Sequence, residues 1–224
     1  MNSCCAPGDP CCGTSCFFSR WSRIYAKRFR RGGLEPVQKY LLAGIRKHDT
    51  HGCTVLDIGC GVGSLHLTLL NEGAERAIGV DLSEGMLREA KRFADASGVA
   101  GHVQYVVGDF VQLSSSIPES DITILDKVVC CYEDVENLVI TATAKTKSTF
   151  ALSHPKENFL MKSLFRGHTT LARMFRWSFH PFWHNWAEVR SLILARGFEL
   201  VYENATISWR VLVYKRVKRL HPLA

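Results

Sequence analysis

Three glycines at alternate positions mark the segment TVLDIGCGVGSLHLTLL, residues 54–70. Gly59, Gly61 and Gly63 follow an apolar run whose final turn carries Asp57. Glycines between a strand and a helix let the backbone approach a ligand, and the free N–H groups of the helix attract it. An acid beside such a loop suits a cationic group, such as an α-amino group. We therefore predict a ligand-binding loop between a strand and a helix.

The spacing of this loop differs from that of a dinucleotide site. The G-x-G-x-x-G pattern of dinucleotide folds would place its third glycine at position 64. Ser64 stands there, and the third glycine is Gly63. The loop reads G-x-G-x-G, with an acid where the dinucleotide pattern is usually apolar.

Two further acids end later strand-like runs. The run GVDLS places Asp81 22 residues after Gly59, close to the distance at which an acid binds ribose hydroxyls in nucleotide-binding folds. The run VVGDF places Asp109 to accept an exocyclic amine of a base and Phe110 to pack on its ring. Open α/β sheets bind ligands at the carboxyl ends of their strands. The alternative is that these acids only cap helices. Helix capping accounts easily for one such acid but poorly for all three.

Strand-like and helical runs alternate along the chain. This rhythm predicts a doubly wound α/β fold, with a parallel sheet covered on both faces. The runs FELVYENATI and WRVLVYKRV have no helix between them and predict an antiparallel hairpin at the edge of the sheet. The expected strands are 54–58, 76–81, 103–108, 122–126 and 149–153, and the expected helices are 64–72, 83–97 and 134–143.

The motifs VLDIGCGVGSL, GVDLSEGML, VVGDF and DITILDKVV resemble, in this order, those of the class I S-adenosylmethionine-dependent methyltransferases. The resemblance covers roughly residues 52–135. It implies a Rossmann-like seven-stranded sheet whose last strand is antiparallel, and S-adenosylmethionine as cofactor. By motif position, the resemblance implies that the methionine part of the cofactor is surrounded by Asp57, Gly59, Gly61 and Gly63. It implies that Asp81 binds the ribose, and that Leu82 and Met86 flank the adenine. It also implies that Asp109 binds the adenine amine, that Phe110 packs on the adenine ring, and that Asp126 contacts the cofactor.

A more distant resemblance concerns the acceptor side. DKVVCCYEDVENLV and HPKENFLMKSLF resemble the magnesium-protoporphyrin O-methyltransferase group. The segments expected to shape the acceptor site are 126–132, 153–165 and the aromatic face of a helix over 17–29. Methyl transfer from a sulfonium needs a base only when the acceptor must lose a proton. Tyr132 and His154 are the candidate bases, and for each a purely structural hydrogen-bonding role is the alternative.

The N-terminal part divides into two segments. Residues 1–14 combine Cys, Pro and Gly without periodicity and predict an irregular leader. Residues 15–31 predict an amphipathic helix, because Phe17, Trp21, Ile24, Tyr25 and Phe29 recur at helical spacing. We expect this helix to be a lid over the cofactor within a single methyltransferase domain, residues 15–224.

The segment 156–186 is rich in aromatic residues and predicts an inserted helical lid. A weak contact with a membrane surface is the alternative for this insertion. Such a lid favours a small, apolar or aromatic acceptor. His180 and His184 have a helical metal-binding spacing, but Pro181 lies between them and no third ligand stands at a telling distance, so no metal site is predicted.

Five of the nine cysteines lie in the first sixteen residues. They lack the C-x-x-C pairs of zinc sites. A thiol-rich tail that captures a soft metalloid such as trivalent arsenic is an alternative function, because Cys130 and Cys131 fall on the predicted acceptor side.

Composition narrows the class of protein. Apolar residues make up 46% of the 224 residues and charged residues 22%, as in ordinary globular proteins. We find no run of ~18 apolar residues and no secretory signal, which predicts a cytoplasmic protein without a membrane span. The net charge of +7 is concentrated in 20–31 and 214–219. It keeps an RNA-modifying methyltransferase as an alternative, although we expect a small-molecule acceptor and no nucleic acid. Neither the acceptor atom nor the oligomeric state is predicted.

Overall fold

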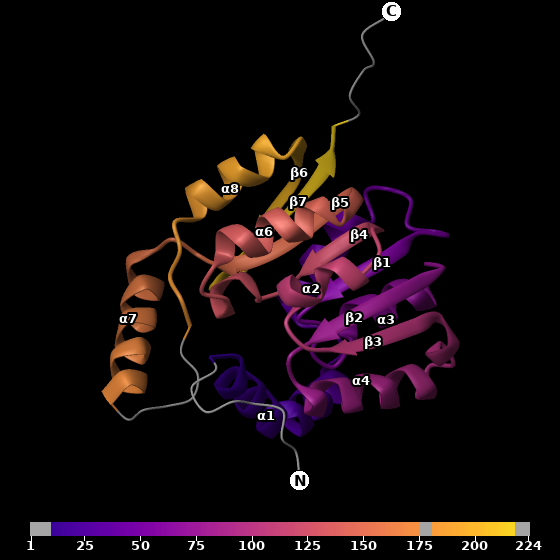
Figure 1. Ribbon diagram of the computed structural model, residues 1–224, viewed down its shortest axis with the longest axis horizontal. Helices are drawn as coiled ribbons and strands as arrows, with labels where there is room; N and C mark the ends of the chain where they lie inside the picture. Colours follow the sequence, from indigo (N-terminus) through magenta and orange to yellow (C-terminus); the bar gives the residue numbers. More distant parts are fainter. Residues whose placement is uncertain (1–9, 175–180, 218–224) are drawn as a thin grey trace, which may run out of the picture.

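The computed structural model describes residues 10–174 and 181–217. A seven-stranded sheet with the order β3-β2-β1-β4-β5-β7-β6 lies between layers of helices (Figure 1). The first five strands are parallel, and β7 runs antiparallel to both β5 and β6. The predicted doubly wound sheet with an antiparallel terminal hairpin is therefore confirmed. The strands are β1 (Thr54–Ile58), β2 (Arg76–Asp81), β3 (Val103–Val107), β4 (Ser120–Leu125), β5 (Thr146–Pro155), β6 (Phe198–Ala205) and β7 (Trp209–Arg216).

Eight α-helices are found in the described residues, and most begin at a residue able to cap them. Ser83 accepts a hydrogen bond from Met86 N at 3.1 Å, and Asp134 accepts one from Asn137 N at 3.0 Å. These side chains satisfy N–H groups that have no partner within the first helical turn. The helices are α1 (Pro10–Gly32), α2 (Pro36–Ile45), α3 (Ser64–Asn71), α4 (Glu84–Ala96), α5 (Phe110–Leu113), α6 (Val135–Ala144), α7 (Phe159–Met174) and α8 (Trp186–Ala195). None of the described helices is long and apolar enough to cross a membrane.

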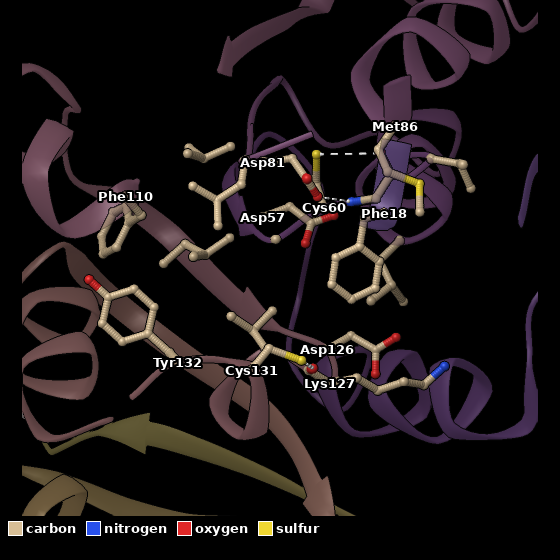
Figure 2. Close-up of a pocket in the computed structure, with 18 of the residues that line it drawn as sticks. Phe18, Asp57, Cys60, Asp81, Met86, Phe110, Asp126, Lys127, Cys131 and Tyr132 are labelled. Atoms are coloured by element: carbon tan, nitrogen blue, oxygen red, sulfur yellow. Dashed lines mark hydrogen bonds between the residues drawn. The ribbon is translucent and has the colours of Figure 1, made fainter. Parts of the chain in front are cut away.

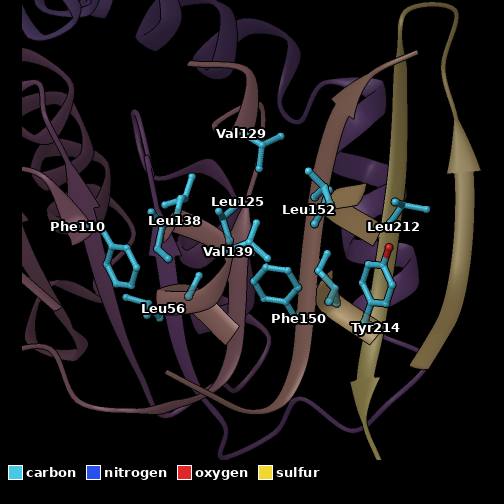
Figure 3. Close-up of a cluster of buried hydrophobic side chains, with 14 of the residues drawn as sticks. Leu56, Phe110, Leu125, Val129, Leu138, Val139, Phe150, Leu152, Leu212 and Tyr214 are labelled. Atoms are coloured by element: carbon cyan, nitrogen blue, oxygen red, sulfur yellow. The ribbon is translucent and has the colours of Figure 1, made fainter. Parts of the chain in front are cut away.

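Each face of the sheet carries its own buried cluster. Leu56 of β1 and Phe150 of β5 belong to the cluster beneath α6 and α8 (Figure 3), whereas Val55, one residue earlier, belongs to the cluster beneath α2 and α3. Successive residues of a strand point to opposite faces, so a strand buried on both faces is apolar throughout. This is why apolar residues are adjacent in both strands, as Val55 and Leu56 are in β1 and Ile124 and Leu125 are in β4.

The strand order reverses beside β1. The chain passes from β1 outward to β2 and β3, and then crosses back so that β4 lies on the other side of β1. The two connections leave a crevice at the carboxyl ends of β1 and β4, the usual ligand position in open α/β sheets. Asp57 of β1 and Asp126, which directly follows β4, both stand at this crevice.

The N-terminal helix begins earlier than predicted. Helix α1 starts at Pro10, inside the segment 1–14 that the sequence predicts to be irregular. Proline is tolerated in a first helical turn because the N–H that it lacks has no partner there. Residues 1–9 lie outside the described part of the chain, and the division into leader, lid helix and domain stays a prediction.

The aromatic face predicted for α1 is two faces. Ala26 is buried against α4, and Phe29 meets Phe93 of α4 edge-to-face with ring centroids 5.0 Å apart. At 100° per residue, the stripe formed by Phe17, Trp21 and Ile24 lies on another side of the helix. These three side chains are 38%, 43% and 42% exposed. The prediction of one aromatic face directed at the acceptor site is therefore wrong.

Candidate functional site

A pocket opens at the carboxyl ends of β1, β2, β3 and β4 and is closed on one side by α1 (Figure 2). It brings together the three acid-bearing strand ends that the sequence singles out. Gly63 and His154 are not among its lining residues. The predicted site residues that do line it are Asp57, Gly59, Gly61, Asp81, Leu82, Met86, Asp109, Phe110, Asp126 and Tyr132.

The glycine loop has the geometry of a cradle. Gly59 has φ of 65°, and a Cβ there would lie 2.4 Å from Cγ2 of Val128. Gly61 has φ of 55°, and a Cβ there would meet nothing within 4 Å. Both conformations favour glycine over residues with a side chain. Gly59 therefore permits close packing behind the loop, whereas Gly61 presents bare backbone to the pocket.

Asp81 is held by backbone donors. Its Oδ2 accepts a hydrogen bond from Gly61 N and its Oδ1 accepts one from Ser83 N, both at 2.8 Å. Burial raises the pKa of this carboxyl group to about 6, although the two N–H donors oppose the shift. Each carboxylate oxygen accepts more than one hydrogen bond. The arrangement thus leaves acceptor capacity for a pair of ribose hydroxyls, and the residues present fit a nucleoside.

Asp57 has a buried partner that the sequence analysis did not identify. Its Oδ2 is hydrogen-bonded to Nδ1 of His66 at 2.8 Å, and the side chains are 3% and 0% exposed. On the far side of the imidazole, Nε2 of His66 lies 3.1 Å from the hydroxyl of Tyr105. The chain Asp57–His66–Tyr105 fixes the carboxylate at the edge of the pocket. His66 follows Asp57 by nine residues in the helix after the loop, a spacing with no recognisable motif.

Tyr132 contacts the carboxylate of Asp109. Its hydroxyl lies 3.1 Å and 3.0 Å from the two carboxylate oxygens of Asp109. Asp109 also caps α5 by accepting a hydrogen bond from Val111 N at 2.8 Å. Figure 2 shows Phe110 and Tyr132 on one side of the pocket, and Phe18 and Lys127 on the other. Tyr132 therefore adjoins the carboxylate that the resemblance gives to the adenine amine.

His154 lies in a buried aromatic group outside the pocket lining. Its Nδ1 donates to the carbonyl oxygen of Pro155 at 2.8 Å, and its ring stacks on Trp186 with centroids 4.5 Å apart. Burial lowers the pKa of the imidazole to about 4. The geometry is that of a structural histidine, the alternative role that the sequence left open.

Asp126 is anchored by two side chains from distant parts of the chain. Its Oδ1 accepts a hydrogen bond from Oγ of Ser153 at 2.7 Å, and its Oδ2 accepts one from Nε2 of Gln38 at 3.1 Å. Gln38 also donates to Oγ of Ser64 at 2.9 Å, which ties α2 to the start of α3. Burial raises the pKa of Asp126 despite these donors. Ser153 thus reaches the site through Asp126, and no described residue of 153–165 lines the pocket.

Lys127 lies in the segment 126–132 expected at the acceptor site, but the sequence did not single it out. It is the only Lys or Arg among the described lining residues, and its φ of 60° is in the left-handed region. Its ammonium group pairs with the carboxylate of Glu35 at the start of α2. Burial works against the charge, but Asp126 and Glu35 outweigh it and hold the pKa of Lys127 above its usual range. A non-glycine residue in this conformation is strained and often marks a functional site.

The remaining lining is largely apolar or sulfur-containing. Phe18 and Tyr25 enter from α1, and Cys131 enters from the segment after β4. Burial raises the pKa of Tyr25, so its hydroxyl keeps its proton at neutral pH. No cluster of three or more His, Cys, Asp or Glu with metal-binding geometry occurs in the part of the chain that the structure describes, and His180 lies outside that part.

Comparison with known proteins gives the same result as the geometry of the pocket. Residues 55–147 match a family model described as a methyltransferase domain. This range contains the glycine loop and all the acids of the pocket except Glu35. Residues 55–147 therefore form a methyltransferase domain, of the class I S-adenosylmethionine-dependent kind that the motifs predict. The superfamily predicted from the motifs is therefore confirmed.

Curated relatives match this chain over part of its length. The chain is similar to ribosomal protein L11 methyltransferases, with 33% identity over 72 residues to that of Vibrio campbellii and 34% over 91 residues to that of Alteromonas mediterranea. These matches cover 32% and 40% of this chain. They span only 24% and 31% of the relatives, so the chain matches roughly a quarter to a third of their length.

Solved structures match the fold over most of the chain. Magnesium protoporphyrin IX methyltransferase from Synechocystis, with bound SAH, has a TM-score of 0.68 at 22% identity, covering 93% of this chain and 100% of that one. A Haloferax volcanii putative methyltransferase, in complex with the Trm112 activator, has a TM-score of 0.68 at 15% identity, covering 93% and 99%. At these identities the likeness concerns the fold.

Proposed function

We propose that the protein transfers a methyl group from S-adenosylmethionine to a small, apolar or aromatic acceptor. One observation supports this most directly: a single pocket runs from the glycine loop and its acids to Phe18 and Tyr25 of α1. When bound, the cofactor supplies an electrophilic methyl group on a sulfonium. The acceptor lies against α1, on the side of the pocket where Lys127 stands.

In this proposal the acids of the strand ends hold the cofactor. Asp57 faces the α-amino group, and Asp81 accepts hydrogen bonds from the ribose hydroxyls. Leu82 and Met86 flank the adenine, and Asp109 accepts its exocyclic amine. The bare backbone at Gly61 leaves room for the ligand. Asp126 supports the loop through Gln38 and Ser64.

At the acceptor side, the residues of this chain align the acceptor with the methyl group and exclude water. Phe18 and Cys131 give apolar walls, and Lys127 with Glu35 gives one polar anchor for a polar group of the acceptor. Methyl transfer requires the acceptor atom in line with the bond that breaks, so positioning supplies much of the rate. Tyr25 keeps its proton and acts as a hydrogen-bond donor. Tyr132 and His154, the candidate bases from the sequence, do not border this side of the pocket.

A thiophilic metalloid acceptor is the second candidate. Cys131 lines the pocket, and Cys130 lies behind it with its Sγ 3.9 Å from that of Cys131. Thiolates and thiols are the side chains preferred by soft ions. Cys4 and Cys5 lie outside the described residues and Cys16 is exposed on α1, so this candidate rests on the pair after β4.

The test is transfer of labelled methyl groups from S-adenosylmethionine to fractionated metabolites, followed by mass identification of the product. Trivalent arsenite and an RNA pool form two further acceptor arms. We expect label in an apolar or aromatic product, and no product with Asp57→Asn. Label in arsenite that is lost in Cys131→Ser would establish the second candidate instead. Label only in RNA would contradict a small-molecule acceptor.

A further inference from the structure

Helices α1 and α7 carry an unusual share of the positive charge. Together they hold nine of the 28 Lys and Arg residues and none of the 21 Asp and Glu residues. Their nine positive charges exceed the net charge of +7, because the remainder of the chain has 21 acids and 19 bases. Both lie on the side of the sheet toward which the parallel strands point (Figure 1). The charge is therefore concentrated near the pocket.

The outer face of α1 combines this charge with apolar side chains. Trp21 and Ile24 are 43% and 42% exposed, and Phe17 extends their stripe. At 100° per residue, the exposed Arg20, Lys27 and Arg31 lie along one edge of that stripe. The opposite face of α1 packs on α4 and lines the pocket. Trp21 and Ile24 therefore lie outside the face of α1 that packs on α4.

Helix α7 repeats the pattern independently. It is fixed to the domain through Phe165, whose ring meets that of Trp183 edge-to-face at 5.4 Å. Its other side exposes large apolar residues, with Lys162 and Arg166 flanking them. The exposed apolar residues of α7 are Phe159 (87%), Leu164 (56%), Leu171 (45%) and Met174 (64%).

We propose that the outer faces of α1 and α7 dock on an anionic lipid bilayer. Helices that lie in a membrane interface bury Trp, Phe and Leu among acyl chains and keep Lys and Arg at the headgroups. Each basic residue near an anionic surface adds to the attraction. The absence of acids from both helices removes the repulsion that such a surface would otherwise meet. This inference goes beyond the proposed function, because it concerns binding and requires no turnover.

Nucleic acid is the other polyanion that a basic face attracts. The apolar residues distinguish the two partners. Ile24, Leu164 and Leu171 are aliphatic, and base stacking uses aromatic or guanidinium planes. A bilayer interior accommodates all three. The mixture of exposed aliphatic and basic residues thus favours lipid.

The experiment is flotation of the full chain with vesicles of phosphatidylcholine alone or with phosphatidylglycerol, at low and high salt. We expect binding to the anionic vesicles, weakened by salt, and little binding to phosphatidylcholine. The double variant Arg20→Glu/Lys27→Glu should lower the partition coefficient by roughly tenfold or more, the scale of two lost basic residues near a charged surface. Trp21→Ser with Leu171→Ser should also lower it, at unchanged circular dichroism.

A matched control lies at the opposite edge of the sheet. Arg76 and Lys147 are exposed near the amino-terminal ends of β2 and β5, and Arg76→Glu/Lys147→Glu makes the same charge change there. We expect this variant to bind like the native chain. The proposal would be overturned if the native chain did not bind anionic vesicles at low salt. It would also be overturned if Arg20→Glu/Lys27→Glu and Arg76→Glu/Lys147→Glu weakened vesicle binding equally. It would also be overturned if RNA displaced the vesicles while Trp21→Ser/Leu171→Ser left vesicle binding intact.

Discussion

Gly85, in the first turn of α4, lies directly against the backbone of Ser19 in α1. A Cβ at position 85 would stand 2.9 Å from Cα of Ser19 and 3.0 Å from its carbonyl oxygen. Beside this contact, the hydroxyls of Ser19 and Ser83 share a hydrogen bond of 2.8 Å. The close approach holds α1 over the pocket, because Phe18 precedes Ser19 and lines it.

Gly85→Ala should displace α1. The obstructing atoms belong to the backbone and cannot rotate away, so we expect a loss of ~1–3 kcal/mol in the free energy of unfolding, the usual cost of overpacking. Weaker S-adenosylhomocysteine binding by calorimetry should accompany it. Gly167→Ala is the control, because a Cβ there meets nothing within 4 Å. Equal effects of the two variants would show that the contact does not position α1.

We expect residues 17–31 to close over bound cofactor as a lid. A small buried cluster of three residues, Ala26, Val62 and Met86, joins α1 to the domain, apart from the two main clusters of the sheet. Elements with few buried apolar contacts open most readily. Amides of 17–31 should exchange quickly in the free protein and gain protection with S-adenosylhomocysteine, while those of β1 stay protected throughout. Strong protection of 17–31 in both states would make the helix core structure.

Cofactor affinity should depend on pH through Asp81. Its carboxyl pKa is raised to about 6 by burial, and ribose hydroxyls donate to the charged form. Binding therefore lowers this pKa, and affinity should fall as pH drops from 7.5 to 5. Loss of the acceptor in Asp81→Ala should cost ~1–3 kcal/mol of binding at neutral pH and flatten the profile. An unchanged profile in that variant would remove Asp81 from the ribose site.

Lys127 allows backbone and side-chain roles to be separated. Asn tolerates the left-handed region that Lys127 occupies, so Lys127→Asn should leave the melting temperature close to native. It should lower kcat by roughly 10-fold or more through loss of acceptor positioning, with cofactor affinity retained. Lys127→Val should lower the melting temperature too, because a β-branched residue is strained at φ of 60°. Full turnover by the Asn variant would place the acceptor elsewhere.

The buried His154 should make stability fall in mild acid. Its pKa is about 4 in the folded chain, while the unfolded chain takes up the proton near 6.5. Between these values the unfolded state binds more protons, so the free energy of unfolding decreases as pH falls. The slope for one such group is at most ~1.4 kcal/mol per pH unit. Denaturant titrations should show a shallower decline in His154→Phe, and parallel declines would contradict a neutral buried histidine.

The sequence alone determined the fold class and the strand ends that carry the acids. Residues 54–58 and 76–81 are predicted and observed with the same bounds, because short apolar runs and the glycine loop are local signals. The helical spacing of the apolar residues in α1 contained both of its faces, the one that packs on α4 and the exposed stripe. They were not distinguished, because one helix does not indicate which of its apolar stripes will meet α4.

The tertiary structure alone decided the partners of the site. Glu35 and Lys127 pair although 92 residues separate them, and Gln38 reaches Asp126 across 88 residues. No local pattern encodes such pairs, because they depend on how α2 packs against the carboxyl ends of β1 and β4. Packing of α8 likewise placed Trp186 against His154, and the segments that follow β3 and β4 brought Tyr132 to Asp109. Residue type and strand position predicted these two as candidate bases but not their partners, since the groups that surround a side chain come from elements far apart in the sequence.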